Sequence, residues 1–274
     1  MARSARLRLA LLSWAAAVCA ALLFALLAPR SASAVEALVL SAGAIQVVLA
    51  LVALGGASLA RVPLGQRLGL GASDAGLAST LLLVVGFLGL SQSLESLLQL
   101  AHLRESGTLA QLDAALSDAR GSELALAVFV LGVAPGFGEE LFARGWIQRG
   151  LVPSLGPRAA VLIAAAVFGA LHADPVHSSA AFVLGLYLGA VVELTRSLRV
   201  SILCHISNNL VWVLTAAYGV TLEPVGSGVQ VALALCGASA GALGLAVAFR
   251  GRRLRRVATH REPVAKAEED PQQG

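Results

Sequence analysis

Charge is the scarcest property of this sequence. Only 13% of its 274 residues are Asp, Glu, Lys or Arg, and the mean hydropathy is +0.80. A soluble domain carries roughly 25% charged residues, so this composition excludes an ordinary soluble globular protein and predicts a polytopic membrane protein. The formal net charge of +4 does not indicate a nucleic-acid partner, because the arginines flank the apolar runs in the manner of topological anchors.

Cysteine is also rare. Cys19, Cys204 and Cys236 are an odd number, each inside an apolar run and without metal-type spacing. These features exclude a disulfide framework, and we expect all three to be buried as small apolar side chains. The sequence also lacks an internal repeat of the kind that builds many transporters, and it lacks the H-E-x-x-H motif of one large class of zinc proteases.

What is abundant is long apolar segments. Each is close to the ~20 residues that a helix needs to cross the hydrocarbon of a bilayer. The predicted fold is therefore all-α, a polytopic transmembrane helical bundle of about eight membrane helices. Three small-xxx-small patterns, beginning at Gly132, Gly185 and Gly237, favour close contacts between these helices. The predicted segments lie near residues 7–28, 35–60, 77–100, 123–143, 158–172, 178–195, 199–218 and 227–249.

The basic residues predict an orientation. With the N-terminus inside, nearly all Lys and Arg fall on the inner side, Arg144 and the basic tail included, and the outer side holds Arg30, Arg104 and Arg120. The positive-inside rule then places both termini in the cytoplasm, with a bacterial inner membrane as the expected location. A cleaved signal peptide ending near Ala34 is an alternative for the first segment, but its apolar run of about 22 residues exceeds the usual ~7–15.

Four parts of the chain follow from these patterns. Residues 1–119 hold the first three membrane helices and an external loop, in which residues 101–122 could form a short amphipathic helix. Residues 120–218 form a core with the candidate chemistry, and residues 219–250 form the last membrane helix. The polar tail, residues 251–274, is expected to be disordered, first basic and then acidic.

Two adjacent carboxylates, Glu139 and Glu140, interrupt the fourth apolar segment. A charge at the centre of a membrane helix costs roughly 2.5–3.5 kcal/mol, so such a pair indicates a functional site. Glu140 and Arg144 are four residues apart and can form an ion pair, whereas Glu139 points about 100° away. We expect Pro135 and the glycines after it to break the helix and admit water. The alternative is that the three charges are solvated anchors at the interface.

Two histidines end or interrupt later apolar runs. His172 alone is typical of an interfacial cap. His205 and Asn209 are four residues apart, so they present two donors to one spot, as an oxyanion site requires, or they hydrogen-bond a neighbouring helix. A Cys204–His205 nucleophile is disfavoured because adjacent helical residues point about 100° apart. A serine nucleophile at Ser201 or Ser207 has no better support.

The three motifs together resemble the CAAX-protease and bacteriocin-processing family of intramembrane endopeptidases, over roughly residues 120–215. The family pattern E-E-x-x-x-R, F-x-x-x-H and H-x-x-x-N stands here at Glu139–Arg144, Phe168–His172 and His205–Asn209, although Ala143 replaces the phenylalanine that often precedes the arginine. The resemblance implies that Glu139 activates a water with help from His172, and that His205 and Asn209 stabilise an oxyanion. It also implies that Glu140, Arg144 and Phe168 support the site.

The function expected from the residues and the resemblance is hydrolysis of a peptide bond near the cytoplasmic face of the membrane. The expected partners are the bilayer and a membrane-embedded or lipidated peptide. The resemblance leaves zinc open, with Glu139, His172 and His205 as its ligands, although we favour a mechanism without an obligatory metal. Two other functions are a non-catalytic scaffold or immunity protein of the same fold and a proton-coupled transporter.

Overall fold

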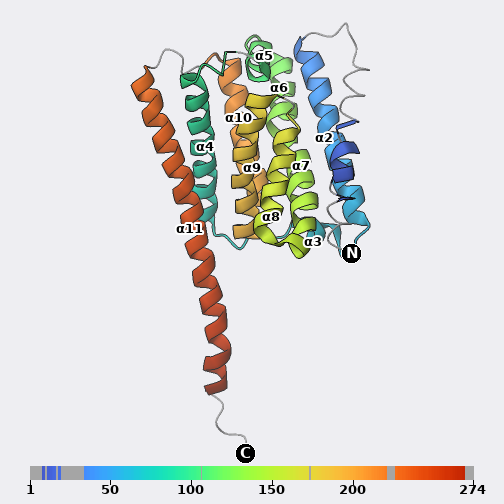
Figure 1. The fold of residues 1–274 in the computed structure, drawn as a ribbon, viewed down its shortest axis with the longest axis vertical. Coiled ribbons are helices and arrows are strands. Elements are labelled where there is room, and N and C mark those ends of the chain that lie inside the picture. Colours follow the sequence, from blue (N-terminus) through green and yellow to red (C-terminus); the bar gives the residue numbers. More distant parts are fainter. Residues whose placement is uncertain are drawn as a thin grey trace, which may run out of the picture.

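The protein is a bundle of helices that run along one common direction (Figure 1). A computed structural model describes residues 8–9, 11–16, 18–19, 34–105, 107–172, 174–220 and 226–268. No strand occurs among these residues, and the all-α prediction is confirmed. The elements are α2 (Ala34–Ser58), α3 (Leu64–Leu68), α4 (Leu77–Leu100), α5 (Gly107–Leu116), α6 (Gly121–Ala127), the π-helix η1 (Val128–Val133), α7 (Ala134–Glu140), the π-helix η2 (Leu141–Gln148), α8 (Arg149–Ala170), α9 (Pro175–Thr195), α10 (Leu198–Ala217) and α11 (Ser227–Glu268).

Six helices in the described part of the chain are long and apolar enough to cross a membrane. One of them, Gly121–Ala170, is 50 residues long and joins two predicted segments. At 1.5 Å per residue it would measure about 75 Å, more than twice the ~30 Å hydrocarbon. It is not straight: Gly156 has φ 78° and ψ 165°, and Figure 1 shows α8 returning beside α7. The polytopic bundle is confirmed, whereas the count of eight is not, since the predicted segment 7–28 lies largely outside the described residues.

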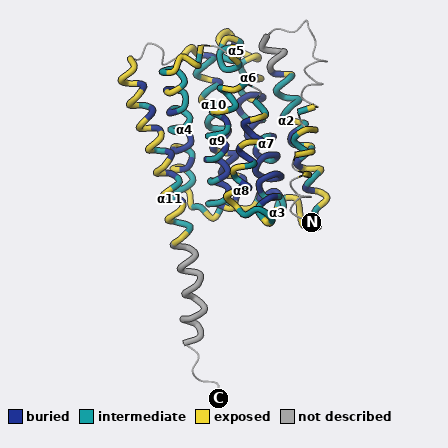
Figure 2. The backbone as a smooth tube through the Cα atoms, in the orientation of Figure 1, coloured by how far each residue is buried: buried dark blue, intermediate teal, exposed yellow. Residues whose placement is uncertain are grey.

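Helices α7 to α10 form the centre of the bundle, with α2 at one edge and the pair α4 and α11 at the other (Figure 1). Figure 2 shows burial concentrated on the central helices and exposed residues along the outer ones. Large apolar side chains such as Leu51, Val85 and Leu243 are exposed in the middle of their helices. An apolar outer surface of this kind suits contact with lipid.

Glycines set the closest helix contacts, as the small-xxx-small patterns predicted. A Cβ added to Gly237 on α11 would overlap the carbonyl oxygen of Gly89 on α4. One added to Gly136 would overlap the side chain of Ile206 on α10, and one added to Gly185 would lie 3.1 Å from Phe168. The absence of side chains at these positions lets the backbones approach.

The helix that carries the carboxylates differs from the prediction. Pro135 and Gly136 do not break it; α7 begins there, with proline in its first turn. The irregularity takes the form of the π-helices η1 and η2 on either side. Proline cannot donate the backbone hydrogen bond of a regular helix, and a π-turn is one way to accommodate that loss without opening the helix.

The short helix expected in residues 101–122 is present as α5. Two other expectations, for the tail and for the cysteines, need correction. Helix α11 runs to Glu268, so residues 251–268 are helical where the sequence predicts a disordered tail. This part continues an existing helix and needs no new nucleus, and its Ala, Arg, Glu and Lys residues favour helix. Of the cysteines, Cys204 is buried as expected, but Cys19 and Cys236 are exposed. An apolar side chain at a lipid-facing position needs no burial in protein.

Candidate active site

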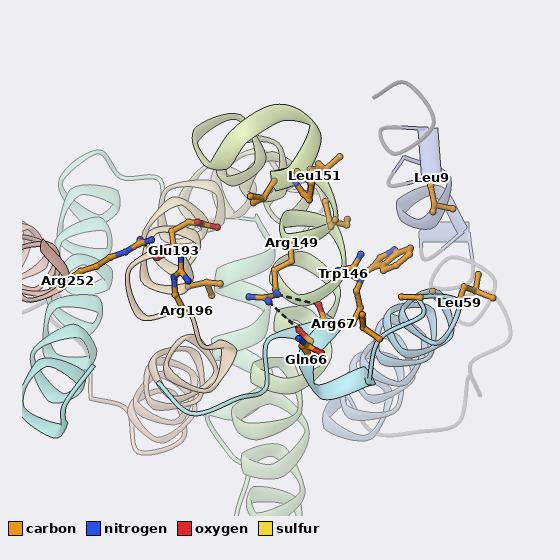
Figure 3. Close-up of a pocket in the computed structure, with 18 residues that line it drawn as sticks. Leu9, Leu59, Gln66, Arg67, Trp146, Arg149, Leu151, Glu193, Arg196 and Arg252 are labelled. Carbon is orange, nitrogen blue, oxygen red and sulfur yellow. Dashed lines mark hydrogen bonds between the residues drawn. The ribbon is translucent and has the colours of Figure 1, made fainter. Parts of the chain in front are cut away.

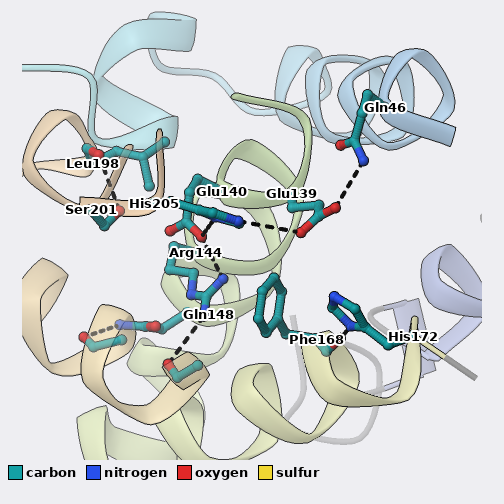
Figure 4. A network of polar contacts seen from close by, with 12 residues as sticks. Gln46, Glu139, Glu140, Arg144, Gln148, Phe168, His172, Leu198, Ser201 and His205 are labelled. Carbon is teal, nitrogen blue, oxygen red and sulfur yellow. Dashed lines mark hydrogen bonds and ion pairs between the residues drawn. The ribbon is translucent and has the colours of Figure 1, made fainter. Parts of the chain in front are cut away.

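Glu140 and Arg144 form an ion pair in the interior of the bundle (Figure 4). Arg144 Nη1 lies 2.6 Å from Glu140 Oε1, and both side chains are 0% exposed. Arg144 Nη2 donates to the carbonyl of Gly185 at 3.1 Å, and its guanidinium lies 4.3 Å from the ring centroid of Phe168. The predicted pair is confirmed. The alternative of solvated interfacial anchors is excluded, and Arg144 does not belong to the inner loop where the orientation argument placed it.

Glu139 points away from that pair, as the 100° offset predicted. One carboxylate oxygen accepts a hydrogen bond from Gln46 Nε2 at 2.8 Å, and the other lies 3.8 Å from His205 Nε2 (Figure 4). Its side chain is 12% exposed, against 0% for Glu140. Gln46 lies on α2, and the sequence analysis missed it. In the sequence, Gln46 stands out only as an amide within an apolar run. That position does not reveal which helix its side chain faces.

His205 lies between the two carboxylates. Its Nδ1 is 3.0 Å from Glu140 Oε1, and its Nε2 faces Glu139. An ionised carboxylate only accepts hydrogen bonds, so Glu140 favours the tautomer in which Nδ1 carries the proton. In the neutral imidazole this leaves Nε2 as an acceptor directed at Glu139. A separation of 3.8 Å between two such acceptors suits a bridging water that donates to both.

His172 joins the site through Phe168. Its Nδ1 lies 3.1 Å from the carbonyl oxygen of Phe168, and the Phe168 ring makes edge contacts with both His172 and His205, at centroid distances of 5.3 and 5.8 Å. Within the part of the chain that the structure describes, His172 makes no hydrogen bond to Glu139. The three predicted motifs therefore converge, but the imidazole that faces Glu139 is that of His205 and not that of His172.

A further imidazole, which the sequence did not indicate, packs against His172 with its ring tilted by 59°. The ring of His177 lies 4.3 Å from it, in the first turn of α9. The same turn is capped by Asp174, which accepts a hydrogen bond from the backbone N–H of His177 at 2.8 Å. That bond holds the pKa of the Asp174 carboxyl below its ordinary value. The start of α9 thus fixes one side of His172.

Asn209 does not point at the carboxylates. Its Nδ2 donates to the carbonyl of Leu131 in η1 at 3.2 Å. This contact matches the helix-to-helix hydrogen bond that the sequence left open. In this conformation, His205 and Asn209 do not direct two donors at one spot.

The site lies near the middle of the bundle. Glu139 precedes Arg149 by ten residues and His205 follows Arg199 by six, so both lie roughly 10–15 Å along their helices from the end that carries these arginines. Helices α7 and α10 pack against each other, which brings Glu139 and His205, 66 residues apart in sequence, to one level (Figure 1).

The metal expectation can be tested on the geometry of the donors. Among the described residues, no group of three or more His, Cys, Asp or Glu side chains is arranged to hold a metal ion. Glu139 and His205 approach each other, but His172 is directed to the Phe168 carbonyl and to His177. These three residues do not fit a zinc ligand set in this arrangement.

Comparison with known proteins bears on the same segment. Residues 121–211 match the family model of type II CAAX prenyl endopeptidase Rce1-like proteins. This segment is similar to the Rce1-like family. The matched third of the chain includes every residue of the three motifs, whereas Gln46 lies outside it. Comparisons with curated proteins and with solved structures found no match.

The match of residues 121–211 to the Rce1-like family model supports an endopeptidase activity in general terms. The apolar helices and the family together make the chain an integral membrane protein. The substrate of a membrane endopeptidase is a peptide or protein.

Proposed function

We propose that this protein is an intramembrane endopeptidase in which Glu139 and His205 position and activate the attacking water. The observation that carries the proposal is the placement of Glu139. One oxygen of its carboxylate is held by Gln46 at 2.8 Å, and the other faces His205 Nε2 at 3.8 Å. A buried base with one oxygen fixed and the other directed at an imidazole is suited to general-base catalysis.

In the proposed reaction, the water between Glu139 and His205 attacks the carbonyl carbon of the scissile peptide bond. Glu139 accepts one proton from the water as the new C–O bond forms. When the tetrahedral intermediate collapses, the C–N bond breaks and the leaving amine takes that proton from Glu139. His205, held by the Glu140–Arg144 pair, keeps its Nε2 directed at the water while Glu139 accepts the proton.

His172 and Asn209 have supporting roles in this scheme. His172 packs on Phe168 beside the same site and assists the positioning of the water. Asn209 stabilises the oxyanion only if its donor leaves the Leu131 carbonyl when substrate binds, so this role requires a local rearrangement. No step needs a metal ion, and none is assigned to one.

The proposed substrate is a membrane-embedded or lipidated peptide, in keeping with the prenylated substrates in the family's name. A catalytic group halfway along the bundle is reached more readily from within the bilayer than by a soluble chain. We also propose that the basic end of the bundle faces the cytoplasm, with both termini on that side, in a bacterial inner membrane.

The test compares new peptide termini in membranes from cells that express the intact protein, the Glu139→Gln variant or the Glu123→Gln variant. Glu123 is exposed at the start of the same long helix and serves as the matched control. Fragments should appear with the intact protein and with Glu123→Gln but be absent with Glu139→Gln at equal protein levels. Full cleavage by a folded Glu139→Gln protein contradicts the mechanism, and no fragments from any form favours a non-catalytic scaffold.

A further inference from the structure

A cavity of about 930 Å³ lies away from the carboxylates. It is found at the end of the bundle where α2, α3, α8, α9 and α11 come together (Figure 3). Trp146, which helps to line it, follows Glu139 by seven residues, or about 10 Å along the helix. The cavity is therefore separate from the proposed catalytic site.

Four arginines from four different helical elements line this cavity: Arg67, Arg149, Arg196 and Arg252. Glu193 is the one acidic residue among the described lining residues. Its carboxylate accepts a hydrogen bond from Gln148 Nε2 at 3.0 Å, and its backbone carbonyl accepts one from Arg252. The wall thus carries an excess of positive charge, which favours a ligand with a phosphate group.

Two of these guanidinium groups are held in place. Arg149 donates from Nε to the carbonyl of Arg67 and from Nη2 to that of Gln66, each at 3.3 Å. The Arg67 guanidinium lies over the ring of Trp146, 5.1 Å from its centroid. Because these side chains are already ordered, a bound anion costs less side-chain entropy than it would at a mobile surface cluster.

The opposite side of the cavity is apolar. Figure 3 shows Arg252, Arg196 and Glu193 on one side, with Leu9 and Leu59 on the other. Leu59 is 83% exposed, although it lies at the end of a candidate membrane helix. A free phosphate ion would leave these leucines uncovered, whereas a molecule with both an anionic head and an aliphatic chain would cover them.

We propose that this cavity binds an anionic phospholipid, with the phosphate between the arginines and an acyl chain over Leu59 and Leu9. Its position supports a membrane lipid, because the cavity opens at the end of the membrane helices, where arginine and tryptophan occupy the interface. The proposal does not depend on proteolysis, and the Glu139→Gln variant should bind the lipid as well as the intact protein does.

Binding can be measured by native mass spectrometry of the full-length protein in detergent, titrated with phosphatidylglycerol, phosphatidylcholine or inorganic phosphate. The test variant is Arg67→Gln with Arg252→Gln. The matched control is Arg61→Gln with Arg250→Gln, two exposed arginines on the same segments that do not line the cavity. Each cavity arginine should contribute about fivefold, so the test variant should bind phosphatidylglycerol ~25-fold more weakly and the control within about twofold.

Three results would overturn the proposal. Equal affinity for phosphatidylcholine and phosphatidylglycerol would remove the anionic head as the feature recognised. An equal loss of affinity for phosphatidylglycerol in the test and control variants would indicate that the lipid is attracted to a basic surface in general and does not bind in the cavity. Displacement of phosphatidylglycerol by millimolar inorganic phosphate would make the ligand a soluble phosphate. A test variant that fails to fold is replaced by Arg196→Gln, for which a loss of about fivefold is expected and no loss would count against the site.

Discussion

One imidazole connects two carboxylates that have different tasks. Glu140 is paired with Arg144 and sealed from solvent, and it orients His205. Glu139 is held by an amide and keeps one oxygen directed at the other nitrogen of His205. Two adjacent residues of the same type can act differently here because the helix turns them towards different neighbours.

Gln46 should matter for turnover although it touches no reacting atom. Gln46→Leu removes the bond that fixes Glu139, and we expect turnover to fall about tenfold to a hundredfold, because small errors in the position of a catalytic group are costly. Gln46→Glu should not restore activity, whereas Gln46→Asn should restore part of it. Steady-state cleavage of a membrane peptide gives kcat and KM for each variant.

A purely structural role for Gln46 predicts a different outcome. Loss of packing would lower the melting temperature in parallel with activity, and it would do so in Gln46→Asn as well. If Gln46→Leu keeps full kcat, Gln46 has no positioning role.

The Asn209→Ala variant distinguishes between the two roles proposed for the Asn209 side chain. If Asn209 donates to the oxyanion, turnover should fall by roughly 10²–10³ with little change in melting temperature. If its task is the bond to the Leu131 carbonyl, stability should fall by about 1–3 kcal/mol instead, because a buried acceptor loses its donor. Parallel measurement of cleavage and thermal unfolding distinguishes the two, and a loss of turnover below tenfold removes Asn209 from the oxyanion role.

The sequence predicts contacts within one helix better than contacts between helices. The Glu140–Arg144 pair and the separate direction of Glu139 follow from helical periodicity alone. The contacts of His205 with Glu140 and of Gln46 with Glu139 depend on how helices are rotated against one another, which spacing along the chain does not specify. The resemblance to a family grouped the three motifs, but it could not find a partner outside them.

At the scale of elements, π-helices replace the helix break that the sequence predicted. The hydrogen-bonded loop of a π-turn contains one more residue than that of an α-helix. The extra residue rotates the side chains that follow it around the helix axis. With η1 before α7 and η2 after it, the short α7 presents Gly136 to α10 and Glu139 to α2. Local composition signalled an irregular helix here, but proline and glycine do not by themselves specify its kind.

The contact between α4 and α11 makes a prediction about packing. Gly237→Ala should destabilise the protein by roughly 1–3 kcal/mol, because the new Cβ overlaps a backbone oxygen that cannot rotate away. Gly228→Ala on the same helix is the control, since a Cβ there meets nothing within 4 Å. Thermal unfolding in detergent measures both. Equal melting temperatures for the two variants would show that the helices separate at little cost.

For the whole molecule, hydropathy located the spans but not how they connect. The predicted segments 123–143 and 158–172 are present, but η2 and the start of α8 are helical between them and place Arg144 inside the bundle. Arg67, Arg149, Arg196 and Arg252 still lie together at one end. The orientation argument therefore does not depend on Arg144.

The orientation has a direct test in intact cells. Ala72 and Ser117 are exposed in connections at opposite ends of the bundle. An impermeant thiol reagent should label Ser117→Cys but not Ala72→Cys if the basic end faces the cytoplasm. The unmodified chain, with its three native cysteines, gives the background. Labelling of Ala72→Cys alone would reverse the topology.

The bond between Gln46 and Glu139 crosses the boundary of the Rce1-like segment. A chimera that exchanges only residues 121–211 with those of a relative would carry the three motifs but would take its support for Glu139 from a foreign second helix. We expect such a chimera to be active only where that helix places a hydrogen-bond donor opposite Glu139, as Gln46 does here. The unit that can be transplanted is therefore larger than the unit that a family comparison recognises.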